Sequence, residues 1–187
     1  MRVIAGSAKG RGLKTLAGKN TRPTTDKVKE AIFNILTPYL QGGTVLDLYA
    51  GTGGLSIEAL SRGMSYAVLV DHNRQSLEII KENLVSCGFS EVAEVYKNDA
   101  ERALKALAKR GIKFDLVFLD PPYRRVNYQQ LLEKFRQFEL VKSQGIIVVE
   151  HDANELLAEM ADSYSVIKRV SYGQIGLTVY KAVNTVN

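Results

Sequence analysis

The sequence predicts a doubly wound α/β fold, in which a mostly parallel sheet of seven strands ends in an antiparallel hairpin. Short β-branched runs alternate with longer stretches of helical periodicity, which favours right-handed crossovers and a parallel sheet covered on both faces. The connection at residues 172–175 is too short for a parallel return, so the last two strands must be antiparallel neighbours. The length of 187 residues fits one such domain with a sizeable core.

The first predicted helix begins near Asp26, which Thr24 or Thr25 can cap, and it ends at Pro38 and the following glycines. Strands are then predicted at residues 44–50, 66–71, 93–98, 114–120, 145–150, 165–171 and 176–182. Helices are predicted between them at residues 54–62, 73–87, 100–110, 128–138 and 153–161. In such folds ligands bind outside the carboxyl ends of the strands, so we expect the functional residues there.

The composition is that of a globular protein, with 45% hydrophobic and 24% charged residues. No apolar run approaches the eighteen or so residues of a membrane span, so secretion and membrane insertion are disfavoured. The single cysteine, Cys87, cannot form an internal disulfide, and two distant histidines with one thiol make a poor zinc site. We therefore expect a cytoplasmic protein that binds neither membrane nor metal.

The positive charge is concentrated at the N-terminus. Residues 1–30 hold eight lysines and arginines against two acidic residues, and the net charge of the chain is +5. Glycines are interleaved with these cations, which predicts a flexible or β-hairpin-like basic arm over residues 1–23, ahead of a main domain over residues 24–187. Such an arm suits a polyanion such as nucleic acid, although it can also be a merely solubilising tail. The candidate nucleic-acid contacts are Arg2, Lys9, Arg11, Lys14, Arg22 and Lys27.

A glycine-rich turn follows the first strand, in the segment DLYAGTGGLSIEAL. Its candidate cofactor-binding residues are Ala50, Gly51, Thr52 and Gly53. A dinucleotide site would have a third glycine where Ser56 stands, and Asp47 adds a carboxylate that suits an ammonium group better than a phosphate. The implied cofactor is cationic, and S-adenosylmethionine fits, with its ammonium at Asp47 and its carboxylate at the N–H groups of the turn.

Two further strand ends offer carboxylates for a nucleoside. Asp71 lies twenty residues after Gly51, from where it can accept hydrogen bonds from ribose hydroxyls in NAD and S-adenosylmethionine enzymes alike. His72 follows it and is either a cofactor contact or polar filler. Asp99 can bind an adenine amino group while Ala100 offers a backbone donor, but Asp99 can equally cap the next helix.

The most specific signal is Asp120-Pro121-Pro122-Tyr123 at the end of the fourth strand. Two consecutive prolines form a stiff turn without N–H donors, so acceptors dominate the local surface. The carboxylate of Asp120 and the carbonyl of Pro121 can accept both hydrogens of an exocyclic base amine, and Tyr123 can stack on the base. These three residues are the predicted catalytic residues. The alternative is a rigid turn with Tyr123 as core filler.

Positioning matters for this chemistry because the lone pair of a base amine is delocalised into the ring, which makes the nitrogen a poor nucleophile. Two acceptors favour a tetrahedral nitrogen and stabilise its developing positive charge. The product ammonium can then lose a proton to Asp120 or to water. The motif therefore predicts methylation of a base amine.

The segments MRVIAGSAKGRGL, RPTTDKVKEAIFNIL, DLYAGTGGLSIEALSRG and LDPPY resemble, in this order, the RsmD family of bacterial methyltransferases, over nearly the whole chain. The resemblance implies a Rossmann-like, S-adenosylmethionine-dependent methyltransferase fold with Asp120 and Tyr123 at the target base. It also implies as substrate the exocyclic amine, N2, of a guanine in small-subunit ribosomal RNA, on an assembled or partly assembled subunit. We expect a monomer.

Three other functions stay open at this point. The chain could methylate an amine in DNA or in another RNA, although 187 residues leave little room for a domain that reads a DNA sequence. It could be a non-catalytic RNA-binding assembly factor that retains the fold. An NAD-dependent oxidoreductase is disfavoured by Ser56.

Overall fold

Seven strands and five α-helices are present in the part of the chain that the computed structural model describes, residues 1–16, 26–121, 126–160 and 163–183. The predicted α/β fold with mostly parallel strands and a C-terminal antiparallel hairpin is confirmed. The chain divides into two compact units, Met1–Asp99 and Ala100–Asn187, which we call the N-terminal unit and the C-terminal unit.

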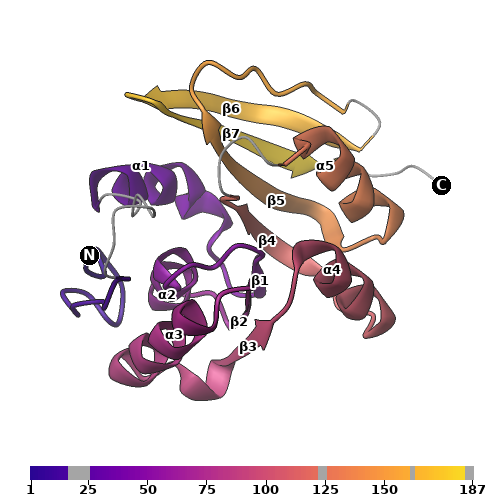
Figure 1. The fold of residues 1–187 in the computed structure, drawn as a ribbon. Helices are drawn as coiled ribbons and strands as arrows, with labels where there is room; N and C mark the ends of the chain where they lie inside the picture. The colour runs from indigo at the N-terminus through magenta and orange to yellow at the C-terminus, as the bar shows by residue number, and fades with distance from the viewer. Residues whose placement is uncertain (17–25, 122–125, 161–162, 184–187) are drawn as a thin grey trace. The chain divides into compact units, whose positions relative to one another are not determined.

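In the N-terminal unit, three parallel strands lie in the order β3-β2-β1 (Figure 1). Its elements are α1 (Asp26–Leu36), the 3₁₀ helix η1 (Thr37–Tyr39), β1 (Thr44–Asp47), α2 (Gly54–Ser61), β2 (Tyr66–Asp71), α3 (Arg74–Cys87), the 3₁₀ helix η2 (Ser90–Val92) and β3 (Ala93–Lys97). The Asn73 side chain caps α3 by accepting a hydrogen bond from the Gln75 amide at 2.8 Å. Gly88, at φ 77°, ends the same helix in the left-handed conformation that glycine tolerates best.

In the C-terminal unit, the strands lie in the order β4-β5-β7-β6 (Figure 1). Its elements are α4 (Ala100–Lys109), β4 (Phe114–Leu119), α5 (Tyr128–Gln137), β5 (Val141–Asp152), β6 (Tyr164–Tyr172) and β7 (Ile175–Ala182). β4 and β5 are parallel, whereas β7 pairs antiparallel with both β5 and β6. Only Gly173 and Gln174 connect β6 to β7, which confirms the predicted hairpin.

Two sequence-based predictions need correction. The strand predicted over residues 44–50 ends at Asp47, the last residue in register with β2, because Leu48 and Tyr49 already form a turn. The helix predicted over residues 153–161 is wrong, since no helix is found in residues 153–160. The carbonyls of Leu157 and Ala158 instead accept hydrogen bonds from side chains of β6 and β7. These long-range bonds replace the local bonds of a helix.

The other predicted helices and strands are present, and most of their ends match the prediction or differ from it by one residue. The exception is β5, which begins four residues earlier and ends two residues later than predicted. The helix α2 is short and buried on almost every side, including its polar residues Ser56, Glu58 and Ser61. Those side chains need hydrogen-bonding partners, because a buried polar group without one is costly. Among the described residues, no helix is both long and apolar enough to cross a membrane.

Residues 1–14 fold back on themselves and form what we call the N-terminal hairpin. Arg2 and Gly12 make an antiparallel bridge, and the Val3 amide donates to the Arg11 carbonyl at 2.9 Å. Three apolar residues of the hairpin, Val3, Ala8 and Leu13, are buried. Of the two predicted forms of the basic arm, these residues adopt the hairpin-like one. They belong to the N-terminal unit.

Candidate functional site

The glycine-rich turn, residues 50–53, connects β1 to α2. Gly51 and Gly53 have φ angles of 56° and 81°, in the left-handed region that favours glycine. A Cβ atom at Gly53 would lie 3.3 Å from the Leu69 side chain, so the space beside Gly53 is already filled by the protein. At Gly51 a Cβ atom would meet nothing within 4 Å, so this side of the turn is open to a ligand.

Asp47, the last residue of β1, is buried, with 2% of its surface exposed. Its Oδ2 atom accepts a hydrogen bond from the Ser56 hydroxyl at 3.0 Å. The pKa of the Asp47 carboxyl is raised to about 7, chiefly by burial and to a smaller extent by the nearby Asp71 carboxylate, while the hydrogen bond from Ser56 lowers it. A cationic ligand group would favour the ionised form of Asp47, as the predicted role requires.

Asp71 ends β2 and lies directly against the glycine-rich turn. Its Oδ2 atom accepts from the Gly51 amide and its Oδ1 atom accepts from the Asn73 amide, both at 2.8 Å. The structure thus brings together two of the predicted cofactor elements. His72 follows on the surface, with 79% of its side chain exposed and its Nδ1 atom 3.6 Å from Asp71 Oδ1.

The two predicted adenine contacts lie just after β3, which ends at Lys97. The Asp99 amide donates to the side-chain oxygen of Asn98 at 3.0 Å, and Asp99 itself is exposed. Ala100 is the first residue of α4. The position of Asp99, exposed and beyond the strand end, is compatible with a ligand contact and with a cap alike.

In the C-terminal unit, Asp120 and Pro121 follow β4. Asp120 is half-buried and Pro121 is buried. The neighbouring parallel strand places Val149 beside Leu119, so Asp120 comes next to the stretch of β5 that contains Glu150. Pro122 and the predicted catalytic residue Tyr123 lie outside the described residues.

A cavity of about 570 Å³ opens in the C-terminal unit, close along the chain to the proline-rich motif. Its described lining includes Asn127, Gln129, Glu155, Leu156, Met160 and Tyr180. No described lining residue is basic, and three of them offer amide or carboxylate oxygens. Tyr128 closes one side and donates its hydroxyl to the Glu150 carbonyl at 3.1 Å. The rest of the described lining is mostly apolar.

Five of the six predicted nucleic-acid contacts lie within the described residues, and all five are exposed. Arg2 pairs with Asp26 at 3.5 Å and Lys14 with Glu82 at 2.7 Å. Lys9 and Arg11 occupy the hairpin, whereas Lys27 lies in the first turn of α1. Arg22 lies outside the described part of the chain. The hairpin therefore presents cations to solvent on a folded support.

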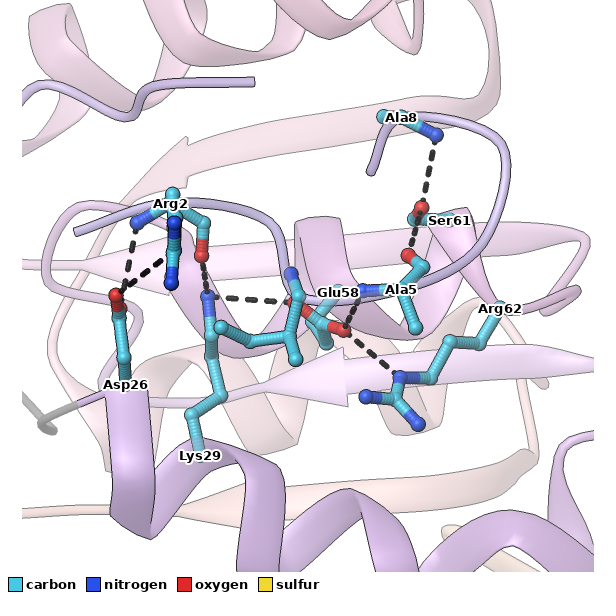
Figure 2. Close-up of polar contacts among 9 residues, drawn as sticks. Arg2, Ala5, Ala8, Asp26, Lys29, Glu58, Ser61 and Arg62 are labelled. Atoms are coloured by element: carbon cyan, nitrogen blue, oxygen red, sulfur yellow. Dashed lines mark hydrogen bonds and ion pairs between the residues drawn. The ribbon is translucent and has the colours of Figure 1, made fainter. Parts of the chain in front are cut away.

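Sequence reasoning missed the buried network that holds this hairpin on α2 (Figure 2). Glu58 Oε2 accepts from the Ile4 amide at 2.8 Å and Oε1 from the Ala5 amide at 3.0 Å. The same carboxylate pairs with Lys29 at 3.3 Å and with Arg62 at 2.8 Å (Figure 2). The side chains of Lys29 and Glu58 are fully buried, and burial lowers the pKa of Lys29.

Ser61 extends this network by one turn of α2. Its hydroxyl accepts from the Ala8 amide at 2.9 Å and donates to the Ala5 carbonyl at 2.6 Å (Figure 2). The Lys29 ammonium also donates to the Arg2 carbonyl (Figure 2). One sequence signal was available for the network, because Glu58 stands among apolar residues in a helix that has few solvent-facing positions. A charge at such a place needs a buried partner.

Known proteins resemble the chain over almost all of its length. Residues 1–181 match the family model described as "Conserved hypothetical protein 95". "Putative rRNA methyltransferase YlbH" of Bacillus subtilis is 48% identical, over 97% of this chain and 98% of its own length. "Ribosomal RNA small subunit methyltransferase D" of Escherichia coli K12 is 30% identical, over 97% of this chain and 89% of its own.

Solved structures agree with these sequence comparisons. A structure titled "Putative methyltransferase yhhF from Escherichia coli" is 30% identical and superposes with a TM-score of 0.85 over 98% of both chains. A more distant structure, titled "A putative sam-dependent methyltransferase from Streptococcus mutans", is 15% identical and shares the fold with a TM-score of 0.68. The predicted methyltransferase fold and the predicted family are thereby confirmed. The chain belongs to the family of the ribosomal RNA small subunit methyltransferase D proteins, and it is a methyltransferase.

Proposed function

We propose that this chain transfers the methyl group of S-adenosylmethionine to the exocyclic amine, N2, of a guanine in small-subunit ribosomal RNA. The observation that carries the proposal is the Asp-Pro-Pro-Tyr motif after β4, in a chain whose relatives include proteins named ribosomal RNA small subunit methyltransferase D. The enzyme acts as a monomer in the cytoplasm, on the small subunit or its assembly intermediate.

The residues around the glycine-rich turn fit the proposed cofactor. Asp47 takes the cofactor ammonium, directly or through water, because burial raises its pKa to about 7 and a bound cation would favour the ionised carboxylate that burial disfavours. In the turn, residues 50–53, the Gly51 and Gly53 amides donate to Asp71 and Ala50, so the Thr52 amide is the proposed donor to the cofactor carboxylate. Asp71 accepts from the ribose hydroxyls. When bound, S-adenosylmethionine supplies an electrophilic methyl group on a positively charged sulfur.

Three further residues complete the proposed cofactor site. His72, largely exposed beside Asp71, borders the ribose. Asp99 accepts from the adenine amino group, and the backbone of Ala100 donates to the adenine ring. These roles need exposed polar atoms just beyond strand ends, and Asp99 lies exposed in such a place.

Asp120 and Pro121 hold the nucleophile in this proposal. The Asp120 carboxylate accepts one N–H of the guanine amine, and the Pro121 carbonyl accepts the other. This pair draws the nitrogen toward a tetrahedral geometry and stabilises the positive charge that develops as the N–C bond forms. The nitrogen then carries one proton too many, which passes to the Asp120 carboxylate or to water. Half-burial of Asp120 supports this role, because the carboxylate is neither sealed in the core nor fully solvated.

The RNA must present its guanine outside a base stack, because a stacked amine cannot reach a residue at a strand end. In our proposal Tyr123 stacks on the extruded base. Phosphates of the surrounding RNA contact the basic arm, residues 1–23, through Arg2, Lys9, Arg11, Lys14 and Arg22, and also contact Lys27 at the start of α1. Exposure of the described members of this set supports that assignment. The counterions that each phosphate contact releases give the binding its strength.

Methyl transfer with labelled S-adenosylmethionine tests the proposal. The acceptors are free ribosomal RNA, small subunits without methylation and duplex DNA, and the labelled base is mapped in each case. We expect label on N2 of one guanine of the small-subunit RNA. Label on a DNA adenine or a pyrimidine carbon would contradict the assignment. Tight RNA binding without any transfer would identify a non-catalytic assembly factor instead.

A further inference from the structure

One buried amide touches both the N-terminal hairpin and the glycine-rich turn. Asn83, in α3, is 1% exposed. Its Oδ1 atom accepts from the Lys14 amide at 2.8 Å, and its Nδ2 atom donates to the Lys14 carbonyl at 3.1 Å. The same Nδ2 atom donates to the Thr52 carbonyl at 3.0 Å. Thr52 belongs to the proposed cofactor turn, and Lys14 closes the hairpin.

The chemistry of these contacts fixes the orientation of the amide. Both hydrogens of Nδ2 are used on carbonyls, and Oδ1 accepts the N–H of Lys14. Rotation of the amide by half a turn would place its oxygen against two carbonyls. In that orientation the buried amide would lose these hydrogen bonds, and a buried polar group without its partners destabilises the fold. A movement of the Thr52 carbonyl therefore displaces the Asn83 side chain, which is the hydrogen-bonding partner of the Lys14 backbone.

The hairpin that carries the exposed cations is held by buried side chains of α2. Glu58 holds the amides of Ile4 and Ala5, and Ser61 holds the backbone of Ala5 and Ala8. Lys9 and Arg11 are exposed on this clamped support. Three helices, α1, α2 and α3, hold the hairpin through buried side chains. A displacement of the backbone at Lys14 therefore acts on the whole hairpin.

A second contact joins the hairpin to the same region. A Cβ atom at Gly54, the first residue of α2, would lie 2.6 Å from the Met1 sulfur, so the Met1 side chain packs directly on the end of the glycine-rich turn. Met1 is also joined to Leu13 by a backbone hydrogen bond of 2.9 Å. One end of the hairpin, Met1, therefore packs beside the glycine-rich turn, and the other end, Lys14, is linked to the turn through Asn83.

We propose that Asn83 is a positioning residue that couples the glycine-rich turn to the N-terminal hairpin, so that cofactor in the turn strengthens RNA binding by the hairpin. The identity of the two ligands rests on the proposed function. Coupling between two binding sites is reciprocal, so RNA strengthens cofactor binding by the same factor. The Lys14 backbone, and not its side chain, carries the link.

Binding measurements with S-adenosylhomocysteine and a small-subunit ribosomal RNA fragment test this coupling. In the wild-type protein, saturating S-adenosylhomocysteine should lower the Kd for the RNA by about fivefold or more. In N83A the two Kd values for RNA should be equal. The matched control is E82Q on the same helix, which removes the ion pair with the Lys14 side chain but keeps the backbone contacts. Its coupling should equal that of the wild type.

Hydrogen exchange on the wild-type protein tests the link between the glycine-rich turn and the hairpin. It needs neither RNA nor a substituted protein. S-adenosylhomocysteine alone should slow exchange at Lys14, Ile4 and Ala5 as well as in the glycine-rich turn. Protection confined to the turn would overturn the proposal, and so would equal coupling in N83A and the wild type. A protein that shows this protection but methylates no ribosomal RNA would refute the proposed substrate and leave the coupling intact.

Discussion

The Ser56 hydroxyl donates a hydrogen bond of 3.0 Å to the Asp47 carboxylate, and both residues are buried. Ser56 occupies the position where a dinucleotide-binding turn would have its third glycine. The serine therefore has a second role besides disfavouring a dinucleotide ligand. It supplies one donor to a carboxyl whose pKa burial raises to about 7, and so helps to keep Asp47 available to a cation.

The affinity for S-adenosylhomocysteine should depend on pH through Asp47. The ammonium of the ligand needs an ionised carboxylate, and the pKa of Asp47 lies at about 7 before the ligand binds. Binding must therefore displace a proton below pH 7, so calorimetry should show a Kd that rises roughly tenfold for each pH unit below that point. Above pH 7 the Kd should level off.

The variant D47N is the control for this pH dependence. Its neutral amide fills the same space but cannot ionise, so its Kd should be higher at pH 8 and nearly constant between pH 6 and pH 8. An unchanged Kd for the wild type over that interval would show that the ligand ammonium does not depend on Asp47.

Gly6 and Gly10 form a matched pair for testing how tightly the hairpin is docked. Their φ angles are 84° and 83°, so an added side chain strains both backbones equally. A Cβ atom at Gly6 would lie 1.7 Å from the Ser61 carbonyl oxygen, whereas at Gly10 it would meet nothing within 4 Å. In urea denaturation, G10A should lose about 1 kcal/mol and G6A about 3 kcal/mol or more. Equal losses would mean that the hairpin is not held against α2.

The cations of the hairpin should contribute to the salt dependence of RNA binding. K9A/R11A removes two exposed charges and, for two lost phosphate contacts, should reduce the slope of log Kd against log salt concentration by about 1.5. The control K109A/K168A removes two exposed lysines of the C-terminal unit and should leave the slope unchanged. Similar slopes for the two double variants would rule out the hairpin as the RNA contact. Deletion of the hairpin is a poorer test, because it would leave Glu58 and Lys29 buried without their backbone partners.

Periodicity and strand-end chemistry could predict the α/β fold, the C-terminal hairpin and the proximity of Asp71 to the glycine-rich turn. These features follow from local rules, since the carboxyl end of each parallel strand must lie at the same sheet edge. The strand ends at Asp71 and Asp120 were therefore placed within one residue.

The docking of the hairpin could not be predicted in the same way. It depends on contacts such as Ile4 to Glu58 and Lys14 to Asn83, which join residues 54 and 69 positions apart and leave no periodic signal. The helix predicted at residues 153–161 is not found in residues 153–160 for a related reason. The distant side chains of Arg169 and Tyr180 donate hydrogen bonds to carbonyl groups of this segment. Tertiary hydrogen bonds there outweigh local helix propensity.

The proposed methyl transfer depends most directly on Asp120, because its carboxylate is the proposed acceptor for the guanine amine. Single-turnover methyl transfer should be measured with labelled S-adenosylmethionine on unmethylated small subunits, for the wild type, D120N and D120A. The Kd values for S-adenosylhomocysteine and for RNA should be measured beside it. We expect transfer to fall by about 10³-fold in both variants while both Kd values stay within about threefold of the wild type. Wild-type transfer by D120A would show that the Asp120 carboxylate does not hold the guanine amine.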